Sequence, residues 1–105
     1  MIPQWPDLVL MRLPLGRDHA ITLSELAERM GTSRRVIEKS IEALRLRGEA
    51  VCTGSDGAWV SHDAAELRQH ADRLRSRAVT VLLGARALRA TARRHSRVQQ
   101  LGMDL

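Results

Sequence analysis

The sequence predicts a small, mainly α-helical protein with one β-hairpin and a long helix in its C-terminal part. Three observations support this fold class. Apolar residues recur at spacings of three and four before residue 48, alternate as in strands between residues 50 and 61, and return to helical spacing from about residue 63. The chain has 105 residues, 44% of them hydrophobic and 28% charged. This size suits one small core and excludes a large multidomain enzyme.

The first helix is predicted to begin at Pro6, whose missing N–H costs nothing at a helix start, and to end before Pro14. Its broad apolar face would be formed by Leu8, Val9, Leu10, Met11 and Leu13. Residues 15–19 are expected to form a loop, and residues 20–21 a short extended step before the second helix.

The second helix is predicted from a capping box, in which the Thr22 hydroxyl accepts from the N–H of Glu25 and the Glu25 carboxylate reaches back. This helix would bury Leu23, Leu26, Ala27 and Met30. Gly31 ends it, because a left-handed turn has no steric cost for glycine, and Ser33 can cap the third helix almost at once.

The third helix is predicted to run from Ser33 to Gly48 with two distinct faces. The apolar stripe would contain Val36 or Ile37, then Ser40, Ile41 and Leu44. The opposite face carries Arg34, Arg35, Glu38, Lys39 and Glu42, and an Arg35–Glu38 pair would stabilise it. Arg45 and Arg47 are expected to interact with the carbonyl end of the helix dipole.

Beyond Gly48, residues 50–53 and 58–61 are predicted to be two strands of a hairpin, joined by Gly54, Ser55, Asp56 and Gly57. Asp63 can then cap a helix of roughly 30 residues that continues to about Arg94. The predicted organisation is a first domain over residues 1–62, a long helix over residues 63–97 and a flexible tail over residues 98–105.

This order of helices and hairpin resembles the winged helix-turn-helix DNA-binding family over about residues 7–61. The likeness is carried by residues 23–41, where Ala27, Gly31 and Ile37 stand at the helix crossing, the turn and the anchor of the third helix. Within this family, the segment most resembles the head domain of the biotin-operon repressor and small regulators of bacteria or phages.

The resemblance implies that the third helix enters the major groove of double-stranded DNA with its N-terminal side chains nearest the bases. The implied DNA-binding residues are Thr32, Ser33, Arg34, Arg35, Glu38 and Lys39. The implied wing residues are Ser55 and Asp56, and here the chain departs from the family because this tip is acidic. Residues 1–63 also hold 8 basic and 9 acidic side chains, whereas residues 64–105 hold 9 and 3.

The long helix carries a seven-residue repeat that predicts a coiled-coil seam. Its a and d positions, the predicted oligomerisation residues, are Leu67, Ala71, Leu74, Ala78, Val81, Ala85, Leu88 and Ala92. The seam could pack on the same chain or on a second copy; the length of the helix favours a homodimer or higher oligomer. Arginines at the flanking e and g positions argue against a simple parallel zipper, namely Arg68, Arg75, Arg77 and Arg89.

These features predict a cytoplasmic DNA-binding protein, acting as a transcriptional regulator by occupancy, with no membrane segment and no catalytic, cofactor or metal site. The lone Cys52 excludes an internal disulfide, and His62, Glu66 and His70 lack a fourth metal ligand. Two alternatives remain open. One is a winged-helix adaptor or scaffold that binds a protein partner; the other is a DNA-packaging recognition subunit of a phage.

Overall fold

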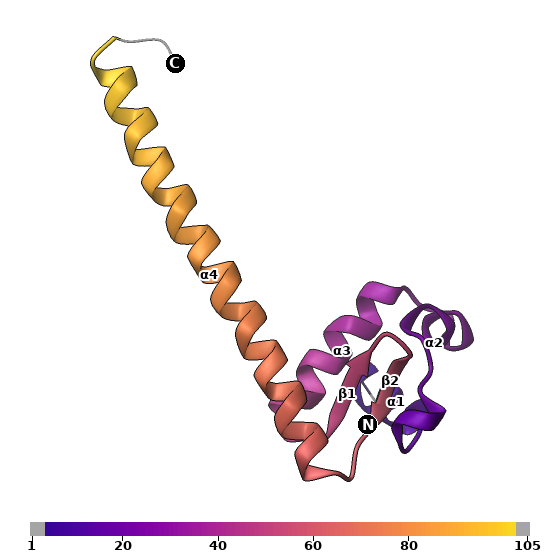
Figure 1. Cartoon of the computed structure of the whole chain (residues 1–105). Coiled ribbons are helices and arrows are strands. Elements are labelled where there is room, and N and C mark those ends of the chain that lie inside the picture. Colours follow the sequence, from indigo (N-terminus) through magenta and orange to yellow (C-terminus); the bar gives the residue numbers. More distant parts are fainter. Residues whose placement is uncertain (1–3, 103–105) are drawn as a thin grey trace. The chain divides into compact units, whose positions relative to one another are not determined.

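The computed structural model describes residues 4–102 and confirms the predicted fold class. Residues 1–3 of the predicted first domain and residues 103–105 of the predicted tail lie outside the described residues. Figure 1 shows the element order: α1 (Trp5–Arg12), η1 (Arg17–His19), α2 (Leu23–Met30), α3 (Arg34–Leu46), β1 (Val51–Gly54), β2 (Gly57–Val60) and α4 (Ala64–Gln100). The chain divides into two compact units, residues 1–70 and residues 71–105.

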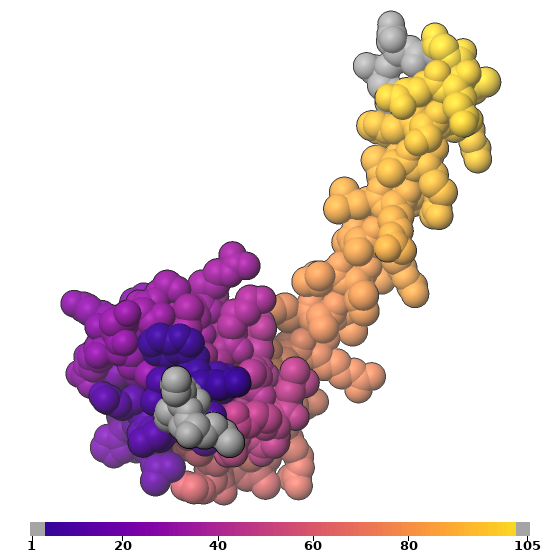
Figure 2. All heavy atoms as spheres, turned by 180° about the vertical axis from the view of Figure 1, so that it is seen from behind, coloured from indigo at the N-terminus to yellow at the C-terminus, as the bar shows by residue number. Residues whose placement is uncertain are grey.

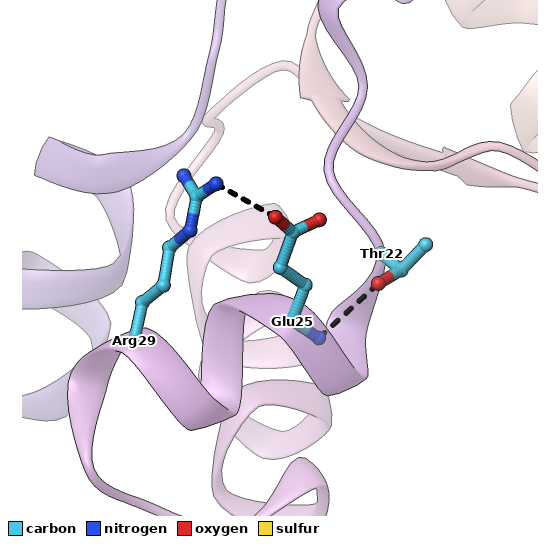
Figure 3. Close-up of polar contacts among 3 residues, drawn as sticks. All are labelled: Thr22, Glu25 and Arg29. Atoms are coloured by element: carbon cyan, nitrogen blue, oxygen red, sulfur yellow. Dashed lines mark hydrogen bonds and ion pairs between the residues drawn. The ribbon is translucent and has the colours of Figure 1, made fainter.

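The start of α2 shows how local chemistry sets the helix boundaries. The Thr22 hydroxyl accepts from the backbone N–H of Glu25 at 3.1 Å, as the capping box predicts. The Glu25 carboxylate accepts instead from Arg29 one turn further along α2, at 2.6 Å (Figure 3). The expected reach back toward Thr22 is therefore replaced by an i,i+4 ion pair on the exposed surface of the helix.

The core of residues 1–70 lies where α1, α2, α3 and the hairpin meet. Its largest fully buried side chains include Val9, Leu26, Ile37 and Leu44, each at most 1% exposed. Full burial of such side chains contributes roughly 1.5–3 kcal/mol each. The structure thereby selects Ile37 over the half-buried Val36 as the apolar anchor of α3. Met11 was expected on the buried face of α1, but it is 78% exposed because α1 buries only its Val9 side.

The hairpin pairs β1 with β2 in antiparallel register, with Cys52 opposite Trp59. The chain between α1 and α2 flanks the other edge of β2. Val60 N–H donates to Pro14 O at 2.8 Å, and Ala58 exchanges two hydrogen bonds with Ile21. The extended step predicted at residues 20–21 is thus a single bridge at Ile21, and the predicted loop contains the short turn of η1.

Arg45 lies in the last turn of α3, as its expected interaction with the helix dipole requires, and it also joins α3 to β1. Arg45 donates from Nε to Val51 O and from Nη2 to the Thr53 hydroxyl, each at 3.0 Å. Its Nη2 also lies 2.9 Å from Nε2 of His70 near the start of α4. Burial lowers the pKa of Arg45. The Val51 carbonyl and the Thr53 hydroxyl accept hydrogen bonds from its guanidinium and so compensate for the lost hydration. Arg47, the C-cap residue of α3, donates from Nη2 to Asp7 of α1 at 2.8 Å.

The first turns of α4 are attached to the hairpin within the same unit. The indole N–H of Trp59 donates to Glu66 at 2.8 Å. Hydrogen bonds from Ser61 and Trp59 lower the pKa of Glu66. The helix continues to Gln100, three residues beyond the predicted end at residue 97, and Leu101 and Gly102 form a turn. Since residues 95–100 lack helix breakers, helical propensity carries α4 past the end of the seven-residue repeat.

Candidate nucleic-acid interface

The N-terminus of α3 is held in place by a tight turn after α2. Gly31 adopts a left-handed conformation with φ 66° and ψ 36°, which favours glycine. The N–H of Thr32 then donates to Ala27 O at 2.9 Å. The Ser33 hydroxyl accepts from the N–H of Val36 at 3.3 Å and caps α3 as predicted. Thr32 is half-buried in the turn, whereas Ser33 is exposed at the helix start.

Four charged side chains are exposed on the first two turns of α3, but they are not equivalent. Arg34 donates from Nε to Glu38 Oε1 at 3.0 Å, so the ion pair predicted for Arg35 belongs to Arg34. Within residues 4–102, Arg35 and Lys39 form no salt bridge. These two side chains are therefore the positive charges on α3 that are free to meet a ligand.

A shallow groove of about 380 Å³ lies between the start of α1 and this face of α3. It is lined by Trp5, Pro6, Arg35, Val36, Lys39 and Ser40. Its surface is mainly apolar, and its two cations are the unpaired side chains of α3. Sequence reasoning missed this groove, because the periodicity of α3 alone does not show that Trp5 from α1 lies beside Arg35.

The wing tip at Ser55 and Asp56 is exposed between β1 and β2. Asp56 lies 3.8 Å from Nε of Arg17, which reduces the negative charge of the tip. The guanidinium of Arg17 also stands 5.6 Å from the centroid of the Trp59 ring, within the range of a cation–π contact. Arg17 therefore places a positive charge beside the acidic tip.

A comparison with protein-family models finds a match to the family described as an HTH domain over residues 8–53. Residues 8–53 are therefore similar to a helix-turn-helix domain. The match includes α2, the Gly31 turn and α3, and it is consistent with a head domain like that of the biotin-operon repressor. Neither the curated proteins nor the solved structures gave a match to this chain.

α3 is the second helix of this helix-turn-helix arrangement, the position of the helix that reads DNA in proteins of that family. The predicted residues Ser33, Arg34, Arg35, Glu38 and Lys39 lie together on its exposed N-terminal turns, with Thr32 just before them. The Ser55–Asp56 tip lies on the hairpin, beyond the matched segment. The contact of these residues with DNA stays a prediction.

The predicted oligomerisation residues differ in how much of each is covered. Leu67, in the unit of residues 1–70, is half-buried. Those from Ala71 to Ala92 are exposed: Leu74 is 36%, Val81 65% and Leu88 72% exposed. Figure 2 shows side chains standing out along the orange and yellow part of α4. The apolar repeat of α4 therefore remains available to a partner.

Two features of residues 4–102 bear on other functions. Between residues 4 and 102, none of the helices combines the length and the apolar character that crossing a bilayer requires. Over the same residues, no group of three or more His, Cys, Asp or Glu side chains is arranged to hold a metal ion. Cys52 is fully buried, and burial raises the pKa of its thiol, which disfavours the reactive thiolate.

Proposed function

We propose that this protein binds double-stranded DNA through α3 and regulates transcription by occupying its site as a dimer. The observation that carries the proposal is the exposed, unpaired charge of Arg35 and Lys39 on the second helix of a helix-turn-helix domain. A guanidinium can form two hydrogen bonds with a guanine edge or a phosphate, and an ammonium adds a point charge. No covalent bond is made or broken in this mechanism.

The decisive experiment removes the two unpaired charges from α3. Arg35→Ala combined with Lys39→Ala should weaken duplex binding by at least about tenfold, since each lost contact costs roughly 1–3 kcal/mol. Arg12→Ala combined with Arg29→Ala removes the same number of exposed positive charges from α1 and α2 and serves as the control for net charge, with Arg29 ion-paired to Glu25. Affinities are compared by fluorescence anisotropy at one stated salt concentration.

Arg34→Ala provides a finer test of the same face. Because Arg34 is already paired with Glu38, its removal should weaken DNA binding less than the removal of Arg35. Equal affinities for the wild-type protein and the Arg35/Lys39 variant would reject α3 as the reading helix. Circular dichroism establishes that each variant keeps its fold.

The dimer is proposed from the exposed repeat on α4. Alanine at each a position from 71 to 92 permits close approach of two helices, and Leu74, Val81 and Leu88 supply apolar contacts at d. A stripe that stays exposed along several turns is favourable in water only if a partner covers it. Two linked reading helices also bind one duplex more tightly than one.

The excess of arginine at the e and g positions argues against a simple parallel zipper, but the individual e and g partners favour parallel, in-register pairing over antiparallel pairing. In a parallel pair each e position faces the preceding g position of the other helix. Arg75 then faces His70, Leu82 faces Arg77, and Arg89 faces Gly84, so no arginine opposes another. In the antiparallel register that centres on Ala78 and Val81, e positions face each other and bring Arg68 opposite Arg89.

A single cysteine tests both the dimer and its orientation. Ala92→Cys should cross-link between two copies under mild oxidation if the helices are parallel, because equivalent a positions then adjoin. The wild-type protein is the control, since its Cys52 is buried. A mass of one chain in light scattering at micromolar concentration would reject the dimer, and a dimer without the cross-link would reject the parallel arrangement.

The groove beside α3 favours a second candidate function, an adaptor that binds a protein segment. Its apolar lining from Trp5, Pro6 and Val36 resembles a recess for an apolar side chain more than a surface for phosphate. A gel shift on random duplex across a salt series separates the two functions. Binding that weakens steeply with salt supports DNA, whereas the absence of any shift at low salt favours the adaptor.

A further inference from the structure

The C-terminal part of α4 carries a group of positive charges that is separate from the charged face of α3. Residues 86–97 contain five arginines and no acidic residue, and all five side chains are exposed. They are Arg86, Arg89, Arg93, Arg94 and Arg97. None of them forms a salt bridge within residues 4–102, and Asp72 is the nearest acidic residue before this segment.

Several basic side chains in the unit of residues 1–70 are paired with acidic ones, which reduces the free positive charge that can attract phosphate. Arg29, Arg34 and Arg47 each form an ion pair, and Arg17 lies near Asp56. Arg45 is engaged with β1. Neutralisation of phosphates supplies most of the sequence-independent affinity of DNA-binding proteins. A protein with this unit as its reading head therefore needs another source of positive charge.

We propose that residues 86–97 of α4 form a second, sequence-independent contact with the phosphate backbone of double-stranded DNA. The inference rests on the proposed function for its ligand, but it concerns a different helix and a different kind of contact. We name duplex DNA as the ligand because residues 8–53 of the same chain match a helix-turn-helix domain. Binding to an anionic membrane or to an acidic protein would be a different result.

The spacing of the arginines suits a row of phosphates. Arg86, Arg93 and Arg97 are separated by seven and four residues, so they lie on one face of α4. The row is about 16 Å long at 1.5 Å per residue, comparable to about five base pairs of duplex. Ala87 and Ala90 are the neighbouring small residues, and they leave room for the backbone of a nucleic acid to approach.

The contact is compatible with pairing of α4. Arg86 and Arg93 occupy b positions of the repeat, Arg94 a c position and Arg97 an f position. These positions point away from an a/d seam, so a dimer leaves them exposed and presents two such rows. Arg94 donates to the Thr91 hydroxyl at 3.2 Å, an exposed contact within the helix that neutralises none of its charge.

The test replaces these four arginines together in the full-length chain. The variant R86Q/R93Q/R94Q/R97Q should flatten the dependence of log Kd on log salt by about 2–4 per chain, since each lost phosphate contact changes the slope by about 0.9. Its affinity for random duplex at low salt should fall at least about tenfold. Glutamine sustains helices well, and circular dichroism and light scattering check helix content and mass.

The matched control is R86K/R93K/R94K/R97K, which keeps every charge. It should retain the salt slope of the wild-type protein, because phosphate neutralisation depends on charge more than on guanidinium geometry. An unchanged slope in the glutamine variant would overturn the inference. So would a variant that binds duplex normally but no longer binds phosphatidylserine vesicles, since the segment would then be a membrane contact.

The failure of this inference can be distinguished from the failure of the proposed function. If R35A/K39A has no effect on DNA binding but the glutamine variant flattens the salt slope, the assigned reading face is wrong and the second contact stands. If R35A/K39A weakens binding and the glutamine variant keeps the slope, the reading face stands and the second contact is wrong. A wild-type protein that binds no duplex at any salt would overturn both.

Discussion

Helices α3 and α4 are both rich in arginine and both carry an apolar stripe, but only one stripe is covered. In α3, Ile37, Ile41 and Leu44 are at most 2% exposed, because α1, α2 and the hairpin pack over them. In α4, Val81 and Leu88 are at least 65% exposed. The same kind of sequence pattern builds a core in α3 and leaves an exposed apolar stripe in α4, because the rest of the chain covers only the first.

The largest expected effect is on the free energy of unfolding of the unit of residues 1–70. Leu44→Ala should lower it by about 2–5 kcal/mol, since the fully buried side chain leaves a cavity. Leu88→Ala, the matched change in α4, should leave that unfolding free energy nearly unchanged and should weaken self-association. Urea denaturation measures the unfolding free energy and light scattering measures self-association. Equal losses of unfolding free energy in the two variants would contradict the difference in burial between Leu44 and Leu88.

The next largest effect is expected from replacing a glycine in the hairpin and a glycine in α4, because the two changes should alter stability in opposite directions. Gly57 has φ 118°, and an added Cβ would collide with the backbone of Ile21. Gly57→Ala should therefore destabilise the hairpin by about 1–3 kcal/mol. Gly84 lies in α4 with nothing near its Cβ position, so Gly84→Ala should stabilise the helix by about 1 kcal/mol.

Thermal unfolding followed by circular dichroism checks both glycine variants. Gly54→Ala is a control within the hairpin, because its Cβ would meet the Trp59 ring at an ordinary contact distance of 3.5 Å. If the Gly57→Ala variant were as stable as the Gly54→Ala variant, the result would contradict the close contact between Gly57 and the backbone of Ile21.

A smaller effect is expected from helix hydroxyls. Ser33→Ala should cost about 1 kcal/mol, because the hydroxyl satisfies the N–H of Val36 at the start of α3. Thr80→Ala in α4 should be neutral or slightly stabilising, since the Thr80 hydroxyl donates to a carbonyl already within the helix. Chemical denaturation compares the pair. A larger loss for Thr80→Ala would contradict the assignment of Ser33 as the cap.

The smallest effect concerns acid stability at the junction of the hairpin and α4. Hydrogen bonds from Ser61 and Trp59 lower the pKa of Glu66, so the folded state favours its carboxylate. This stabilisation is complete above the ordinary glutamate pKa of about 4.3 and is lost as the pH falls through the lower folded-state pKa. Glu66→Gln should therefore reduce the loss of stability below about pH 4. Melting temperatures measured from pH 3 to 7 test this, and an unchanged acid profile would contradict it.

Much of the fold could be predicted because helix boundaries depend on neighbours in sequence. Thr22, Gly31 and Ser33 each act within a few residues, and the structure confirms all three. The candidate site was less predictable. The exposed residues of α3 were identified as a set, but Arg34 rather than Arg35 pairs with Glu38, since rotamer geometry decides between i,i+3 and i,i+4 partners.

Some arginines have partners on other elements, which helical periodicity does not indicate. Arg47 pairs with Asp7 across 40 positions, and Arg45 meets Val51 and Thr53 only because the hairpin folds beside the end of α3. The groove beside Arg35 depends on Trp5 in the same way. No local pattern carries this information.

By itself the sequence determined the helices, their caps, the hairpin turn and the apolar repeat of α4, because these follow from periodicity and from the backbone preferences of glycine, serine and threonine. The engagement of Arg17, Arg45 and Arg47 was settled only by the tertiary structure. That engagement depends on the distance from each guanidinium to acceptors brought by other elements, and such distances exist only once the chain has folded.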